Sequence, residues 1–240
     1  MATHTTKLLV RQAVAAETFA FHFEKPSEFN FKPGQYVSLA LIDPPESDDE
    51  GTTRSFSIAS APFEPNLMFA TRMRDTAMKR VLGAMPIGTE VKVTGPFGDF
   101  TLDRDSSRPA VLLAGGIGIT PFRSIAVQAA HDKLPNQIRL FISNHTPDDA
   151  AFLEELRALE HQNPNFKLIA TITSSEHLQQ PWQGEHGRID PAMLKRYLKD
   201  LASPIYYTVG PPGMVTAMGG VLRTAGIDSA SIRAEEFTGY

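Results

Sequence analysis

The stretch LLAGGIGITP, residues 112–121, follows a run of aliphatic residues with three glycines in four positions: Gly115, Gly116 and Gly118. The aliphatic run is typical of a buried strand. Thr120 followed by Pro121 is typical of a helix start, because proline needs no amide donor in the first helical turn. The segment therefore predicts a strand, a tight turn and a helix. Bare amides at a helix N-terminus attract a phosphate, although the glycines could also simply join the strand closely to the helix.

Outward from this stretch, the second half of the chain alternates strand-like and helical segments. Strands are expected at 110–116, 138–144, 167–173, 205–210 and 231–237, and helices at 121–132, 147–162, 191–201 and 211–226. Thr146-Pro147 and Asp190-Pro191 repeat the pairing of an N-cap residue with proline. This alternation predicts an α/β domain with a parallel five-stranded sheet over residues 105–240.

The first half has a different pattern, with short alternating segments separated by turn residues. These segments lie at 18–26, 34–42, 54–60, 67–74 and 90–95, and 76–85 is the one stretch expected to be helical. Such a pattern predicts an antiparallel β-barrel. The polar linker 103–109 separates the halves, so we expect a barrel domain at 1–104.

Composition excludes several classes of function. A chain of 240 residues with 42% hydrophobic content can form a core in each of two domains. Its net charge of −4 gives no broad cationic field, so nucleic acid is not an expected partner. The absence of cysteine excludes disulfides, thiolate nucleophiles and cysteine-held iron–sulfur clusters within this chain. No apolar stretch approaches about 18 residues and no leader pattern opens the chain, so we expect a cytoplasmic protein without a membrane span.

Two further stretches carry candidate binding residues. In RSFSIAS, Arg54 and Phe56 point to one face of an extended strand, while Ser55 and Ser57 point to the other. Arginine can hold a phosphate, an aromatic ring can lie against a flat ligand, and serine can hydrogen-bond a ring nitrogen. The segment VGPPGM, residues 209–214, is a second strand-to-helix turn that could flank the same crevice as the glycine turn. Each stretch taken alone is also compatible with an ordinary strand or tight turn.

With GQYVSLAL at 34–41 and the ending EEFTGY, these motifs stand in the order found in the ferredoxin-NADP reductase family, which the chain resembles over essentially its whole length. RSFSIAS is similar to that family's R-x-Y/F-S flavin motif, GGIGITP to its G-G-x-G-x-T-P turn, and VGPPGM to its C-G-P-P-x-M segment. The resemblance implies a FAD-binding barrel at 1–104 followed by an NAD(P)-binding domain at 105–240 with an aromatic C-terminal tail. It implies a reductase module without an iron–sulfur domain.

On the flavin side, the resemblance implies that Arg54 binds a flavin phosphate, Phe56 packs against the ring or ribityl chain, and Ser57 lies near the ring's N5. Thr76 and its helix would offer amides to the pyrophosphate. If the protein holds FMN alone, that last assignment is wrong. The implied set on this side is Arg54, Ser55, Phe56, Ser57, Thr71, Arg72, Met73 and Thr76.

On the nicotinamide side, the resemblance implies a pocket between the glycine turn and the VGPPGM turn. Val209 replaces the family's cysteine, and the terminal Tyr240 would cover the flavin and move aside for the nicotinamide ring. The implied set is Gly115, Gly116, Gly118, Thr120, Pro121, Asn144, Val209, Gly210, Pro211, Met214 and Tyr240. No metal site is expected, because no histidine pair has the spacing of a metal-binding motif.

The implied activity is that of an NAD(P)H-dependent flavin oxidoreductase. Hydride would pass to flavin N5, with Ser57 and Thr120 orienting groups and Tyr240 acting as a lid. Electrons would then reach a separate acceptor such as ferredoxin or another iron–sulfur or haem protein. Glu236, with Glu235 beside it, could relay protons or mark the surface end of the last strand. Alternatives are a reductase of free flavin, ferric chelate or quinone, and a non-catalytic flavin-containing electron-relay subunit.

Two acidic segments bear on ligand choice. Asp148 and Asp149, beyond Asn144, favour NADH over NADPH because carboxylates repel a 2'-phosphate; the same pair is also typical of a helix's first turn. The loop DPPESDDEG, residues 43–51, could face a basic partner, but we expect a solvated loop.

Overall fold

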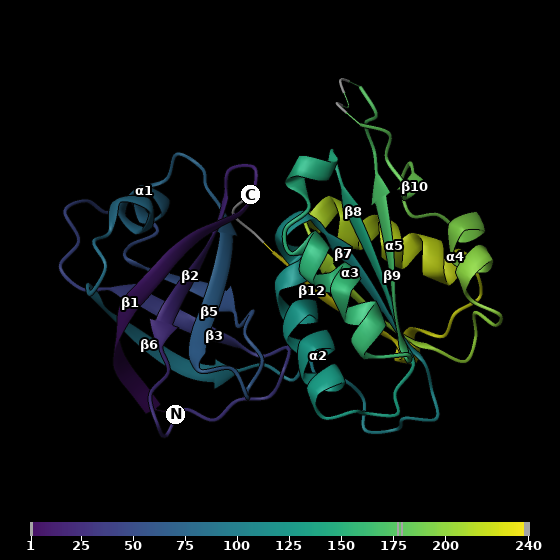
Figure 1. Cartoon of the computed structure of the whole chain (residues 1–240), viewed down its shortest axis with the longest axis horizontal. Helices are drawn as coiled ribbons and strands as arrows, with labels where there is room; N and C mark the ends of the chain where they lie inside the picture. Colours follow the sequence, from purple (N-terminus) through teal and green to yellow (C-terminus); the bar gives the residue numbers. More distant parts are fainter. Residues whose placement is uncertain (1, 177, 179, 238–240) are drawn as a thin grey trace.

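The computed structural model describes residues 2–176, 178 and 180–237, which form two lobes (Figure 1). The first lobe holds strands β1 to β6 and helix α1. Its elements are β1 (Ala2–Ala15), β2 (Thr18–Glu24), β3 (Tyr36–Leu41), β4 (Thr53–Ser57), β5 (Asn66–Arg72), α1 (Ala77–Ala84) and β6 (Glu90–Phe97). The predicted helix at 76–85 is confirmed, and β1 is a strand that the predicted segments omit.

The six strands of the first lobe form an antiparallel sheet in the order β4-β3-β6-β1-β2-β5. The long β1 pairs with β6 through residues 2–7 and then with β2 through residues 8–15, so it turns the sheet toward a barrel. The predicted antiparallel barrel-like architecture is confirmed. The edge strands β4 and β5 are not paired with each other, which leaves the barrel open between them.

The second lobe is a parallel sheet with helices on both faces. Its strands are β7 (Ala110–Gly115), β8 (Ile138–Asn144), β9 (Phe166–Ile172), β10 (Glu185–His186), β11 (Ile205–Gly210) and β12 (Ile232–Glu236). Its helices are η1 (Gly116–Gly118), α2 (Ile119–His131), η2 (Pro147–Asp149), α3 (Leu153–Gln162), α4 (Pro191–Tyr197), α5 (Pro212–Thr224) and η3 (Ser229–Ser231). The five predicted strands are confirmed, and the two-residue β10 adds a sixth.

Alternation of side chains along the strands of the second lobe produces two cores. Leu112 and Leu140 pack with α2 and α3 on one face, while Val111 and Phe141 pack with α4 and α5 on the other (Figure 1). The first of these cores also contains Ala59 and residues of β2 and β5, so it continues into the first lobe.

The strand order in the sheet is β10-β9-β8-β7-β11-β12. Strands β8 to β10 are added on one side of β7, and β11 and β12 on its other side, so the order of strands reverses between β7 and β11. In open α/β sheets, ligands bind outside the carboxyl ends of the strands at such a switch point. The glycine turn follows β7 and the VGPPGM turn follows β11. The topology therefore brings the two predicted phosphate-binding turns to one place.

Helix starts agree with the sequence only in part. Asp190 is the N-cap of α4, and its side chain accepts a hydrogen bond from the Met193 amide at 2.7 Å, as predicted. Thr120 is not an N-cap, because α2 begins at Ile119 and the Thr120 hydroxyl donates to the Ile117 carbonyl. The helix expected at 147–162 is interrupted, since η2 is followed by Phe152 with φ 62° before α3 begins.

The two lobes are joined by a buried arginine on α2. The Arg123 guanidinium donates to the Ala59 carbonyl at 2.8 Å, to both oxygens of Glu64 at 2.8 and 3.0 Å, and to Glu155 at 2.8 Å. The neighbouring Ser124 hydroxyl donates to the Ser60 carbonyl at 2.7 Å. These bonds hold α2 against the segment that follows β4, so they help set how the lobes face each other.

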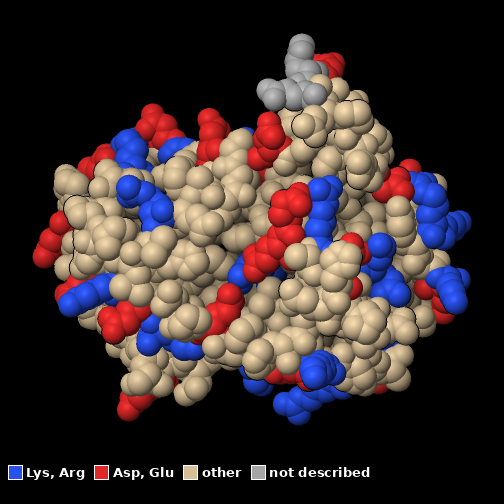
Figure 2. Space-filling model, viewed as in Figure 1, with Lys and Arg blue, Asp and Glu red and all other residues tan. Residues whose placement is uncertain are grey.

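Charged side chains of both signs are interspersed over the face of the molecule shown in Figure 2. Within residues 2–176, 178 and 180–237, no helix combines the length and the apolar character that a membrane crossing requires. Over the same part of the chain, no group of three or more histidine, cysteine, aspartate or glutamate side chains is arranged to hold a metal ion.

Candidate functional site

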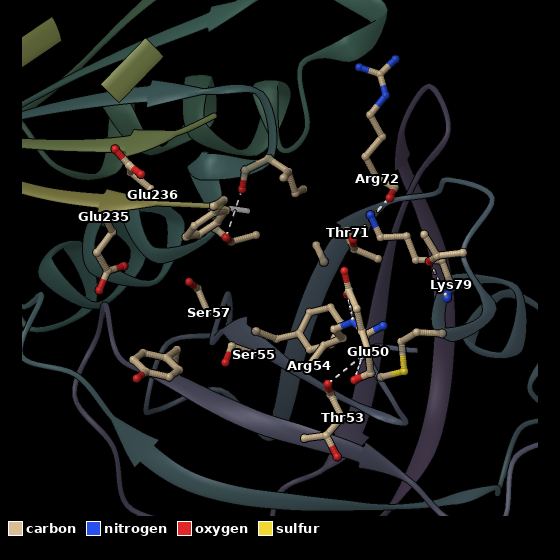
Figure 3. Close-up of a pocket in the computed structure, with 18 residues that line it drawn as sticks. Glu50, Thr53, Arg54, Ser55, Ser57, Thr71, Arg72, Lys79, Glu235 and Glu236 are labelled. Atoms are coloured by element: carbon tan, nitrogen blue, oxygen red, sulfur yellow. Dashed lines mark hydrogen bonds and ion pairs between the residues drawn. The ribbon is translucent and has the colours of Figure 1, made fainter. Parts of the chain in front are cut away.

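A cavity of about 740 Å³ lies at the opening between β4 and β5, where the second lobe meets the first. Strands β4 and β5 and helix α1 form one side, and η1, α2 and the end of β12 form the other. Figure 3 shows Glu235 and Glu236 reaching the cavity from β12, opposite Lys79 and Arg72 of the first lobe.

Nine of the predicted site residues line this cavity. They are Arg54, Ser55, Phe56, Ser57, Thr71, Arg72, Thr76, Thr120 and Glu236. Met73 instead borders an adjacent hollow, together with Arg72. Sequence reasoning assigned no role to eight other lining residues: Tyr36, Glu50, Thr53, Ala70, Met78, Lys79, Ile117 and Phe237. Three of these, Tyr36, Ile117 and Phe237, stand inside motifs that carried the resemblance, and the aromatic character of Tyr36 and Phe237 was the available signal.

Aromatic side chains make part of the wall apolar. Phe56 is half-buried and its ring centroid lies 6.2 Å from that of Phe69 in the first lobe's core. Tyr36 lies 5.6 Å from Phe97, ring centroid to ring centroid. The Phe237 amide donates to the Gly210 carbonyl at 3.0 Å, which fixes its backbone beside the VGPPGM turn. Flat apolar surfaces of this kind suit an aromatic ligand.

Arg54, the predicted phosphate ligand, is fully engaged by the loop that precedes it. Its Nη2 donates to Asp48 Oδ1 at 2.7 Å and its Nε lies 3.0 Å from Glu50 Oε2. Its Nη1 donates to the carbonyls of Glu50, Gly51 and Thr53 at 2.9, 3.0 and 2.9 Å. The expectation that loop 43–51 is solvated holds for Asp43 and Asp49, which are exposed, but the Asp48 and Glu50 carboxylates fold back onto this arginine.

Asp48 also contacts the start of α1. The Ala77 amide, in the first turn, helps to lower the pKa of Asp48. The hydrogen bond from Arg54 is the main cause that lowers the pKa of Asp48. Thr76 caps the same helix end by accepting from the Lys79 amide at 3.4 Å. A negative charge is favourable at this position, because a guanidinium and the positive end of a helix dipole converge there.

Glu235 and Glu236 differ sharply in their surroundings. Burial, and secondarily the charge of Asp99, raises the pKa of Glu235 to about 7. Glu236 is exposed. A group that titrates near neutral pH inside a cavity is better suited to accept and donate protons than an exposed carboxylate. Of the two, Glu235 is thus the stronger candidate for the proton relay, whereas the sequence pointed first to Glu236.

The glycine turn packs directly against the VGPPGM turn. A Cβ on Gly118 would lie 2.5 Å from the Val209 carbonyl oxygen, and one on Gly115 would lie 2.1 Å from Met214 Sδ. Gly118 is required by contact within the chain because its obstacle is backbone, whereas the obstacle at Gly115 is the flexible Met214 side chain, which can move. Gly116 differs, because its φ of +52° favours glycine and a Cβ there would face open space. Gly116 is thus the position of the turn whose backbone is open to an incoming group.

Other residues predicted for the nicotinamide side are mostly interior. The Val209 and Pro121 side chains are buried, and Val209 has no exposed surface. Asn144 is buried at the end of β8, and its Oδ1 has no hydrogen-bond partner among the described residues. Gly210, Pro211 and Met214 form the turn that contacts the glycine turn. The predicted lid Tyr240 lies outside the described residues.

The acidic pair beyond β8 is partly committed to structure. The Asp149 carboxylate accepts from the Thr146 amide at 3.0 Å and from its hydroxyl at 2.7 Å, forming a capping box. It also lies 3.2 Å from Arg72 of the first lobe. The sequence left two interpretations of Asp148 and Asp149: repulsion of a 2'-phosphate, or a place in the first turn of a helix. Asp149 caps a helix, as in the second interpretation, and this weakens the sequence-based preference for NADH. Asp148 remains exposed.

Comparison with known proteins agrees with this geometry. Residues 112–219 match the family model described as oxidoreductase NAD-binding domain. The chain is 29% identical over 232 residues to the glycine betaine monooxygenase reductase subunit of Chromohalobacter salexigens. That match covers 95% of this chain but only 62% of the relative, so the chain spans less than two thirds of the relative's length.

Two solved structures share the whole fold. The flavohem-like FAD/NAD-binding domain of nitric oxide dioxygenase from Vibrio cholerae O1 biovar El Tor has a TM-score of 0.84 at 21% identity, covering 97% of this chain and 98% of that one. A ferredoxin NADP+ reductase from Neisseria gonorrhoeae has a TM-score of 0.79 at 22% identity, covering 98% of each chain. The solved structures show that the whole chain shares their two-lobe fold, and the family model shows an oxidoreductase NAD-binding domain over residues 112–219.

Proposed function

We propose that this protein takes hydride from NAD(P)H by means of a bound flavin and passes the electrons to a separate redox partner. The observation that carries the proposal is the cavity at the lobe junction, which the predicted flavin strand β4 and the glycine turn after β7 border from opposite sides. Residues 1–104 would bind the flavin and residues 105–240 the nicotinamide dinucleotide. A cytoplasmic location, where nicotinamide dinucleotides are available, is part of the proposal.

The residues present fit a flavin. Half-buried aromatic side chains at one part of the cavity suit a flat ring system, and Arg54 with the α1 N-terminus suits a phosphate. On the other side, the open backbone at Gly116 and the unpaired Asn144 Oδ1 suit a second polar ligand. The solved reductase from Neisseria gonorrhoeae is described with bound FAD and NADP, which supports the same pair of ligands here.

A bound flavin supplies hydride acceptance and the release of electrons singly or in pairs. The chain's own residues would then position the reactants. Ser57, buried at the cavity wall, and Thr120, held by its bond to the Ile117 carbonyl, would orient groups beside the ring. Glu235 would hold or release a proton near neutral pH.

The proposed electron acceptor is a separate protein carrying an iron–sulfur or haem centre. Support comes from the relative in Chromohalobacter salexigens, whose name describes the reductase subunit of a monooxygenase. Because this chain contains no cysteine, it cannot itself hold a cysteine-ligated cluster. A second candidate, reduction of free flavin, is favoured by one observation, namely that Arg54, the predicted phosphate ligand, is bonded to carboxylates of its own chain.

Anaerobic mixing of the flavin-loaded protein with NADH or NADPH tests the proposal. We expect prompt loss of the oxidised flavin absorbance with at least one of the two, followed by its recovery when an oxidised ferredoxin or a haem protein is added. Turnover of added free flavin in excess over the protein would instead support the second candidate. Persistent absorbance with both dinucleotides would refute NAD(P)H oxidation and point to a relay subunit.

A further inference from the structure

Two buried hydrogen bonds join helix α2 to the segment that follows β4. The Ser124 hydroxyl on α2 donates to the Ser60 carbonyl at 2.7 Å. Beside it, Arg123 Nη1 donates to the Ala59 carbonyl at 2.8 Å. Ser124 and Ala59 have no exposed surface, and Ser60 and Arg123 are also buried. None of these four residues lines the cavity. The contact thus belongs to the interior of the lobe junction rather than to the ligand site.

The first-lobe side of this contact is held in place by its neighbours. The Ala59 amide donates to the Met68 carbonyl at 2.8 Å, and the Met68 amide donates to the Ser60 hydroxyl at 3.0 Å. The Ile58 amide donates to the Gln35 carbonyl at 2.9 Å. Because β5 and the residue before β3 both anchor this segment, the Ser60 carbonyl is a fixed point against which α2 is placed.

The contact lies next to the two residues proposed to orient groups beside the flavin ring. Thr120 precedes Ser124 by four residues, which is about one turn of α2, so both side chains lie on one face of the helix. Ser57 precedes Ser60 by three residues, a span of at most about 11 Å. Thr120 and Ser57 both line the cavity. The bond between Ser124 and Ser60 therefore helps to set the distance across the cavity between Thr120 and Ser57.

We propose that Ser124 is a positioning residue for hydride transfer, because its bond to the Ser60 carbonyl holds the nicotinamide side of the cavity in place against the flavin side. This inference rests on the proposed function. In that reaction the C–H bond at C4 of the reduced nicotinamide breaks, and the hydride, a proton with two electrons, forms a bond to N5 of the flavin. The nicotinamide is oxidised and the flavin is reduced. A misplacement of about 1 Å between reactants can slow such a step about a hundredfold.

Two variants of Ser124 and one matched control test this role. Ser124→Ala removes the donor to the Ser60 carbonyl. Ser124→Cys keeps nearly the volume of the side chain and replaces the hydroxyl with a weak donor, so it separates loss of the bond from the void that alanine leaves. Ser231→Ala is the control, because the buried Ser231 hydroxyl accepts from Arg108 Nη2 at 2.8 Å in the same lobe. Ser231 precedes β12, at the edge of the sheet opposite the cavity.

The experiment follows flavin reduction by stopped-flow absorbance without oxygen, at increasing NADH or NADPH, in the flavin-loaded wild type and the three variants. We expect Ser124→Ala to lower the rate constant at saturating dinucleotide about tenfold, and Ser124→Cys to lower it about threefold to tenfold. The dinucleotide dissociation constant should change by less than about twofold, because neither partner of the lost bond lines the cavity. Ser231→Ala should leave both quantities within about twofold of the wild type.

Amide hydrogen exchange tests the same contact without any turnover, in the flavin-loaded protein before dinucleotide is added. Exchange in residues 58–60 and 119–124 should accelerate about threefold or more in Ser124→Ala, because the lost bond joins these segments. The same segments should be unchanged in Ser231→Ala. Unchanged exchange in both segments of Ser124→Ala would show that the bond does not hold the lobes together, and would overturn the inference.

Three kinetic results would also overturn it. These are a saturated rate constant in Ser124→Ala within about twofold of the wild type, an equal decrease in Ser231→Ala, or a wild-type rate constant in Ser124→Cys, which would assign the loss to the void. If neither dinucleotide reduces the wild type, the proposed function fails and the inference fails with it. A wild type that is reduced, with unaffected Ser124 variants, leaves the proposed function standing and refutes only the positioning role.

Discussion

Replacement of Gly118 by alanine should separate the two turns that meet at the switch point of the parallel sheet. The φ of Gly118 is −58°, so alanine meets no local backbone strain. Its Cβ would, however, lie 2.5 Å from the Val209 carbonyl oxygen and 2.8 Å from the carbonyl carbon, where ordinary contact begins near 3.4 Å. The turn after β7 and the end of β11 must therefore move apart by about 0.9 Å.

This displacement is resisted because β11 is hydrogen-bonded to β7 on one side and to β12 on the other. Overpacking in well-packed regions costs about 1–3 kcal/mol, and we expect Gly118→Ala to lie at the upper end, near 3 kcal/mol, because the obstacle is backbone. For a chain of this size, that loss corresponds to a decrease in melting temperature of about 6–12 °C.

Gly116→Ala is the matched control, because it adds the same methyl group two residues earlier. No heavy atom lies within 4 Å of the added Cβ, so only the left-handed backbone, at a φ of +52°, carries a cost, of about 1–2 kcal/mol. If the open backbone at Gly116 receives the dinucleotide, this variant should instead weaken NAD(P)H binding. Thermal unfolding followed by circular dichroism, together with dinucleotide titration, gives both quantities. Equal loss of stability in the two variants, or greater loss in Gly116→Ala, would refute the packing account.

Three other changes test the lobe junction, the cavity carboxylate and a helix cap. Arg123→Met leaves Glu64 and Glu155 without their buried partner. Because both carboxylates keep partial exposure, we expect the free energy of unfolding, measured by urea titration, to fall by about 2–3 kcal/mol. A decrease below about 1 kcal/mol would show that the network contributes little. The pKa of Glu235 is about 7 in the folded state against 4.5 in the unfolded state, so the folded state binds the proton more tightly. The stability of the wild type should therefore decrease relative to that of Glu235→Gln as pH rises from about 5 to 8. The partly exposed position limits this relative loss to about 1–2 kcal/mol, and identical pH dependence of the two proteins would contradict it. Asp190→Ala removes the α4 cap and should cost about 1 kcal/mol of unfolding free energy, while an unchanged midpoint in the same urea titration would show that the cap is dispensable.

The sequence by itself determined the two-part architecture and the motif positions, because these depend on local patterns. Period-two alternation defined the first sheet, and aliphatic runs followed by N-cap and proline pairs defined the second. Helix boundaries were less certain where a tertiary contact competes with the local signal. The long β1 was not recognised, because its exposed side chains hide the alternation that marks a half-buried strand.

Only the tertiary structure decided which residues share the cavity and why particular glycines are needed. Gly118 is small because the Val209 carbonyl, about ninety residues away in sequence, packs against it. Arg54 is engaged because a loop of no regular pattern folds back over it. Glu235 is half-buried, whereas Glu236 is exposed, because of how β12 packs beside the lobe junction. Such contacts arise from the packing of distant segments, so no local pattern in the sequence encodes them.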